Sequence, residues 1–149
     1  MLAEYCTPDL VRQRLTSGGY LFFADENQNG QPEQSEIDDN INSAIRTAGR
    51  MIDEVLENAG CPTGTARGQG NLWLQDIAVD LAVFRVSTNG GREVIDGFKV
   101  AYDEAQAALT RIRSGMKVPG LKYNRPFPGR SPSGRFPLAI NPGHHRRRY

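Results

Sequence analysis

Residues 72–87 read LWLQDIAVDLAVFRVS, and this stretch decides the fold. Its apolar side chains lie on more than one side of a helix, and only Gln75, Asp76, Asp80 and Arg85 interrupt them. A surface helix shows a single apolar stripe, whereas a helix that is apolar on several sides packs against several neighbours. The sequence therefore predicts a central helix at residues 72–87.

Two long amphipathic helices flank this stretch in the sequence. The first begins at Ser35-Glu36-Ile37-Asp38, which resembles a capping box, and its apolar residues recur in steps of three and four until Gly60. The second covers about residues 92–114, with its apolar residues on one face, and Gly115 ends it. Both helices have the single apolar face that can cover a central helix.

The remaining segments of the first 115 residues are short. Thr7-Pro8-Asp9 places a hydroxyl, a proline and a carboxylate where a helix begins, and Gly18-Gly19 ends that helix early. The Gly- and Thr-rich segment 61–70 predicts an exposed loop. The sequence therefore predicts an all-α fold, a small antiparallel bundle of three long helices and one short N-terminal helix.

The charge of the chain changes abruptly at Gly115. Residues 1–115 carry 17 acidic and 10 basic side chains, whereas residues 116–149 carry eight basic side chains and no acidic one. Six of the nine prolines also lie in this last stretch, which has too few large apolar side chains to form a core of its own. The sequence therefore predicts a helical body at 1–115 and an extended, proline- and arginine-rich arm at 116–149.

The basic arm needs a partner, and two classes of partner fit its composition. Its arginines could neutralise the phosphates of a nucleic acid, which would make the chain a nucleic-acid-binding module. Alternatively, the arm is a docking peptide whose apolar side chains enter pockets on a protein. The spacing of its large apolar side chains favours the protein partner. The residues predicted to make this contact are Phe127, Arg130, Arg135, Phe136, Leu138, Arg146, Arg147 and Arg148.

The composition gives little support for catalysis or for a membrane location. Both histidines, His144 and His145, lie in the arm, so neither Cys6 nor Cys61 has a histidine of the body to activate it. The sequence contains no run of about 18 apolar residues, and its N-terminus lacks the pattern of a signal peptide. We therefore expect a non-enzymatic protein of the cell interior, with free thiols and no cofactor.

One local motif matches a metal-binding template. Residues 25–36 read DENQNGQPEQSE, which fits the calcium-loop pattern D-x-[DN]-x-[DN]-G-x5-E. The ligands would be Asp25, Asn27, Asn29 and Glu36. Binding would be weak because only two of these ligands are charged. The alternative is a solvated turn that leads into a capped helix, which is favoured by the proline at position eight and by the lack of a second loop of this kind.

The order and spacing of several segments resemble those of a known protein family. The segments are Thr7-Pro8-Asp9-Leu10, the turn at 25–30, Ile52-Asp53-Glu54-Val55-Leu56, Asp76-Ile77-Ala78-Val79-Asp80-Leu81-Ala82, Tyr102-Asp103-Glu104-Ala105 and Ile112-Arg113-Ser114-Gly115-Met116-Lys117-Val118-Pro119-Gly120. With these segments the chain resembles the phage head–tail connector (adaptor) proteins, in particular the Mu-like neck protein group of tailed bacteriophages. The resemblance covers residues 5 to about 120.

This resemblance implies a structural role in the virion neck. Such adaptors look like helical bundles that assemble as a ring, commonly of twelve copies, beneath the portal, where they extend the DNA channel. The implied partners are the portal protein, the stopper or tail-terminator protein and further copies of the chain. The protein itself would be made in the cytoplasm of the host bacterium and then be located in the virion neck. DNA would pass without specific binding, and an acidic body suits that role because like charges repel.

Overall fold

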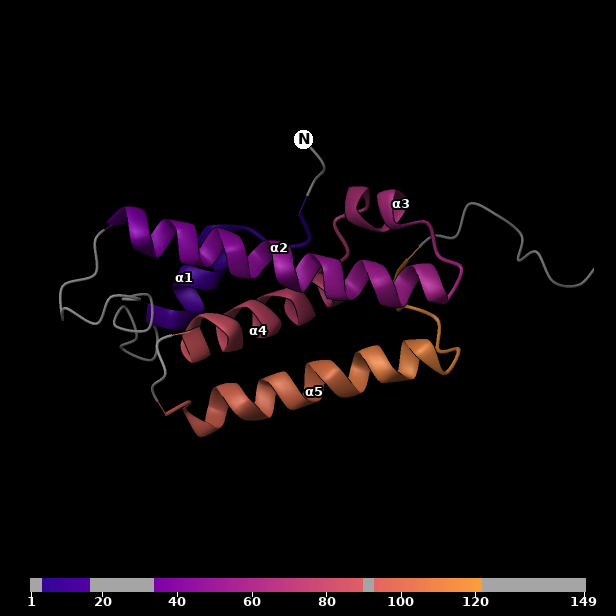
Figure 1. Ribbon diagram of the computed structural model, residues 1–149. Coiled ribbons are helices and arrows are strands. Elements are labelled where there is room, and N and C mark those ends of the chain that lie inside the picture. Colours follow the sequence, from indigo (N-terminus) through magenta and orange to yellow (C-terminus); the bar gives the residue numbers. More distant parts are fainter. Residues whose placement is uncertain (1–3, 17–33, 90–92, 122–149) are drawn as a thin grey trace, which may run out of the picture.

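The computed structural model describes residues 4–16, 34–89 and 93–121, and all regular structure within these ranges is helical (Figure 1). The helices are α1 (Pro8–Thr16), α2 (Gln34–Asn58), α3 (Thr63–Gly68), α4 (Leu72–Asn89) and α5 (Asp96–Arg113). The three long helices alternate in direction, so that α4 runs antiparallel to both α2 and α5. The predicted all-α bundle of three long helices and a short N-terminal helix is confirmed.

Helix α4 lies between α2 and α5 and also contacts α1, as its sequence predicted (Figure 1). Nine of its 18 residues are buried, which is what neighbours on three sides require. Asn71 caps the helix, because its side-chain oxygen accepts a hydrogen bond from the backbone N–H of Leu74 at 3.0 Å. The helix ends at Asn89, two residues later than predicted, and the buried Ser87 hydroxyl donates to the carbonyl of Phe84.

Helix α2 has the single buried face that its sequence predicted. Its buried apolar residues are Ile37, Ile41, Ala44, Ile45, Ala48, Ile52, Val55 and Leu56. The helix stops where Gly60 adopts a left-handed φ of 74°, which glycine tolerates best. The N–H groups of Gly60 and Cys61 then bond to the carbonyls of Glu57 and Leu56, so the last carbonyls of the helix are satisfied.

Helix α5 begins at Asp96, four residues later than predicted, because the backbone at Ile95 is extended. It packs one face on α4 and α2 through the buried Ala105, Leu109 and Ile112. The ring of Tyr102 stacks on Phe84 of α4, with 3.9 Å between the ring centroids. The remaining surface of α5 faces away from these two helices, and Val100 on it is 57% exposed.

Segment 61–70 differs from its prediction. It was expected to be an exposed loop, but it contains α3, and Cys61 and Ala66 are buried. The reason is that α3 folds back against α2, which it contacts. The side chain of Asp53 in α2 is consequently only 22% exposed, because Arg67 of α3 pairs with it.

The chain beyond α5 does not leave the body at once. Val118 and Leu121 are 3% and 8% exposed and belong to the hydrophobic core. The side-chain amide of Asn71 donates to the carbonyl of Pro119 at 2.8 Å, which holds this segment beside the start of α4. Residues 116–121 therefore pack on the body, and the predicted arm from 122 to 149 lies outside the described residues.

Candidate partner-binding site

Most residues that the sequence singled out for function lie outside the described ranges. They are Asp25, Asn27, Asn29, Phe127, Arg130, Arg135, Phe136, Leu138, Arg146, Arg147 and Arg148. Glu36 is described; it lies half-buried in the first turn of α2. Within the described ranges no three His, Cys, Asp or Glu side chains gather in a way that could hold a metal ion.

No helix in the described part of the chain combines the length and the apolar character that crossing a membrane requires. The two cysteines are buried free thiols. Burial raises the pKa of Cys6 to about 12, with a smaller contribution from Glu4, and burial also raises the pKa of Cys61. A thiol with a raised pKa is a poor nucleophile, so these side chains serve the core.

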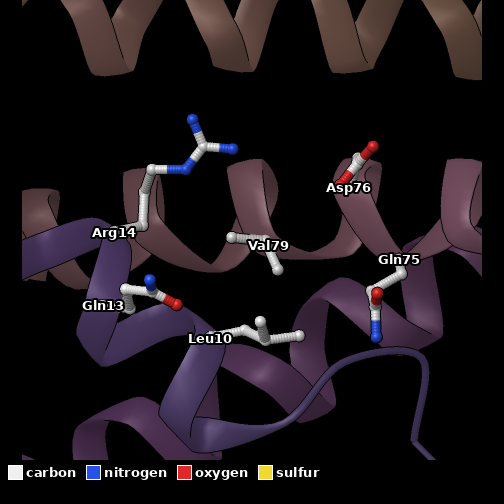
Figure 2. A pocket seen from close by; sticks show the side chains of 6 residues that line it. All are labelled: Leu10, Gln13, Arg14, Gln75, Asp76 and Val79. Carbon is white, nitrogen blue, oxygen red and sulfur yellow. The ribbon is translucent and has the colours of Figure 1, made fainter.

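A hollow of about 300 Å³ opens between α1 and α4. Its lining residues are Leu10, Gln13, Arg14, Gln75, Asp76 and Val79. Figure 2 shows the apolar side chains of Leu10 and Val79 in the middle of this hollow, with the charged groups of Arg14 and Asp76 toward opposite ends. The hollow thus combines an apolar centre with polar ends.

A second hollow of about 230 Å³ adjoins the first, because Arg14 lines both. Its other lining residues are Asp80 and Val83 of α4 and Gly97, Phe98 and Ala101 of α5. A guanidinium nitrogen of Arg14 lies 3.4 Å from a carboxylate oxygen of Asp80, so this ion pair stands where the two hollows meet. We call the two hollows together the α1/α4/α5 groove.

The groove has an excess of negative charge. Burial raises the pKa of Asp80 above its ordinary value, and Asp76 and Glu104 raise it further, whereas Arg14 acts in the opposite direction. Two carboxylates, those of Asp76 and Asp80, thus line the groove together with the one guanidinium of Arg14. A half-buried carboxylate with a raised pKa is a feature that binding sites often contain.

A second polar cluster joins the N-terminal segment to α2 and α3. We call Glu4, Tyr5, Asp53 and Arg67 the N-terminal cluster. Arg67, with a side chain only 11% exposed, pairs with both oxygens of Asp53 and lies 3.1 Å from a carboxylate oxygen of Glu4. The Tyr5 hydroxyl donates to Asp53 at 2.7 Å, and the Arg67 guanidinium lies 5.0 Å from the Tyr5 ring centroid.

The polar groups of the N-terminal cluster form hydrogen bonds and ion pairs with one another. Burial, then the hydrogen bond to Asp53, raises the pKa of Tyr5, and the hydrogen bond to Asp53 raises the pKa of Arg67. Sequence reasoning missed this cluster, although Gly49 was a signal. A Cβ there would lie 3.2 Å from Glu4 and 3.3 Å from Arg67, and glycine within a helix often marks such a close approach. The cluster stabilises the fold, and we take the α1/α4/α5 groove as the candidate partner-binding site.

The comparison with known proteins identifies the family of this bundle. A family model described as Bacteriophage Mu, Gp36 matches residues 5–135, a range that begins in the N-terminal cluster and includes all five helices. No curated protein matches the chain, and no solved structure does. Because the match spans most of the chain, the protein belongs to the Bacteriophage Mu Gp36 family.

Proposed function

We propose that the chain is a non-enzymatic structural virion protein, a head–tail adaptor that forms a ring beneath the portal and connects the capsid vertex to the stopper or tail. The observation that carries this proposal is the match of the entire helical body to a phage family. The specific head–tail role is supported, in addition, by the resemblance in segment order described above. In this role the protein would be located in the neck of the virion.

The distribution of charge supports the adaptor role. Residues 1–115 contain seven more acidic than basic side chains, and a ring of such bodies repels DNA that slides through its channel. Residues 122–149 contain seven basic side chains and no acidic one, so they are available for an acidic protein surface. The partners in this proposal are the portal, the stopper or tail-terminator protein and further copies of the chain, as a ring of about twelve.

The test is assembly onto purified portal rings of the same phage. The full chain is compared with a chain that ends at Leu121, because Leu121 is buried and must be kept. We expect the full chain to sediment with the portal as one complex, and the shortened chain to keep its helical circular dichroism but remain free. Failure of the full chain to join the portal, or normal assembly of the shortened chain, would contradict this proposal.

The alternative function, nucleic-acid binding through the arm, makes a different prediction about salt. A tail that neutralises phosphates loses affinity for DNA steeply as salt is added, roughly in proportion to the number of phosphates contacted. A peptide held by apolar anchors keeps its protein partner under the same conditions. Measuring both affinities at about 0.05 and 0.2 M salt separates the two functions.

A further inference from the structure

We propose that the α1/α4/α5 groove receives the basic arm of an adjacent copy of this chain. This inference rests on the proposed ring. It also names the occupant of the groove and the partner of residues 122–149, which the proposed function leaves open between the portal and a neighbouring subunit.

The groove offers three kinds of contact to a peptide. Leu10 and Val79 provide an apolar surface in the first hollow, and Val83 and Phe98 provide one in the second. Each hollow is at or below the lower limit of about 300 Å³ for sites that hold drug-sized ligands, so each suits single side chains of a peptide. The amides of Gln13 and Gln75 stand beside the apolar surface, where they can bond to a peptide backbone.

The charges of the groove and the arm are complementary. Among the charged residues that line the groove, Asp76 and Asp80 outnumber Arg14, so an arriving guanidinium meets a net negative surface. Residues 122–149 supply arginines close to large apolar side chains, as in Arg125-Pro126-Phe127 and Arg135-Phe136-Pro137-Leu138. A segment of this pattern places an apolar anchor in a hollow and a cation at its rim at the same time.

The length of the arm allows it to reach the groove of a neighbouring copy. The arm leaves the body beside Asn71, where Pro119 is held. Its 28 residues beyond Leu121 can span roughly 90 Å when extended, whereas the 25 residues of α2, the longest helix described, span about 37 Å. Because every copy carries one groove and one arm, arm-to-neighbour contacts are heterologous and repeat until the ring closes.

The experiment uses photo-crosslinking in the full chain. Benzoylphenylalanine replaces Phe127 or Phe136, and the chain is irradiated alone at high concentration and on portal rings. Isotopically labelled and unlabelled copies are mixed, so that mass spectrometry separates crosslinks between copies from crosslinks within one copy. We expect crosslinks between copies, from the arm to peptides of α1, α4 and the start of α5.

Charge reversal provides the specificity test. The double variant Asp76→Lys/Glu104→Lys changes Asp76, which lines the groove, and Glu104, an exposed residue near enough to act on Asp80. The charge-matched control is Asp39→Lys/Glu57→Lys, at exposed positions of α2. We expect the groove variant to lower the apparent affinity between copies by about tenfold and the control to leave it nearly unchanged. Arg130→Glu/Arg135→Glu in the arm should restore crosslinking to the groove variant, because the charges are then exchanged.

The outcomes distinguish this inference from the proposed function. Crosslinks to the portal, to the chain's own body or to another face, as well as an absence of crosslinks between copies, would each overturn the inference, whereas assembly on the portal would still support the adaptor. Conversely, crosslinks in the neighbour's groove without any binding to the portal would support the inference and contradict the adaptor role. Equal effects of the groove and control variants would also overturn it.

Discussion

At the scale of single residues, Asp53 and its neighbour Glu54 provide a matched comparison. Asp53 holds Arg67 and accepts a hydrogen bond from Tyr5, while Glu54, 67% exposed, makes only a 3.5 Å pair with Arg113. Removing one partner of a largely buried pair leaves the other charge without compensation, whereas exposed pairs contribute little. The two adjacent carboxylates should therefore differ strongly in their effect on stability.

We predict that Asp53→Ala lowers the free energy of unfolding by about 2 kcal/mol, because Tyr5 then lacks its acceptor and Arg67 loses both oxygens of Asp53 while it retains Glu4. Glu54→Ala should change it by less than about 0.5 kcal/mol. Urea unfolding followed by circular dichroism measures both values. Equal effects of the two substitutions would show that the N-terminal cluster does not fasten the fold.

A second prediction concerns Asp80 and pH. Because folding raises the pKa of this carboxyl, the folded state holds the Asp80 proton more tightly than the unfolded state does. The ionised Asp80 therefore opposes folding at neutral pH, and this opposition disappears as the pH falls through the raised pKa. Asp80→Asn should raise the urea midpoint at pH 7 and have little effect near pH 3.

The exposed Asp39 of α2 is the control for this prediction, since Asp39→Asn removes a carboxylate without removing a buried charge. A lower midpoint for Asp80→Asn at pH 7 would mean that the ion pair with Arg14 outweighs the burial of the carboxylate. In the opposite, expected case, the protein keeps a group in its groove that lowers its stability. Such a group is better explained by binding than by folding.

At the scale of elements, the sequence predicted each of the three long helices, because each rests on a periodic apolar pattern of five or more turns or on a nearly continuous apolar run. The central position of α4 followed from its many apolar sides, and the stop at Gly60 followed from glycine. Helix α3 could not be predicted in this way. It has only six residues, and Arg67 and Ala66 fix it through contacts with distant parts of the chain.

The candidate groove could not be predicted from the sequence for the same reason. Leu10, Val79 and Phe98 were each predicted to be apolar positions of a helix, but periodicity does not reveal which of them leave a hollow where three helices meet. Asp80 was read as a mere interruption of the apolar run in the central helix. Its contact with Arg14, more than sixty residues away, gives it a role that no local pattern indicates.

Asn71 joins two elements, which leads to a third prediction. Its side-chain oxygen caps α4 and its side-chain nitrogen holds Pro119, so one residue serves both the start of the central helix and the end of the described chain. Asn71→Ala should lower the free energy of unfolding by about 1–2 kcal/mol. Asn89→Ala, at the exposed end of α4, is the control and should have a much smaller effect. Thermal unfolding by circular dichroism compares them, and equal melting temperatures would refute the dual role.

At the scale of the whole molecule, the charge division and the fold do not share the same boundary. The last acidic residue is Glu104 and the composition changes at Gly115, but burial continues to Leu121. Met116, Val118 and Leu121 pack against the core and thereby close one end of the bundle. The bundle thus includes the first residues of the basic stretch, and it is residues 122–149 that we propose to bind a partner.

This organisation predicts different behaviour for two truncations that differ by six residues. A chain that ends at Leu121 keeps the buried Val118 and Leu121, while a chain that ends at Gly115 loses both. Burial of such side chains contributes about 1.5–3 kcal/mol each, so the shorter chain should be less stable by roughly 3 kcal/mol or more. The chain that ends at Leu121 should unfold at the same urea concentration as the full protein, as measured by circular dichroism. If both truncated chains unfolded at the same urea concentration as the full protein, residues 116–121 would contribute nothing to the stability of the bundle. The bundle would then end at Gly115, where the composition changes.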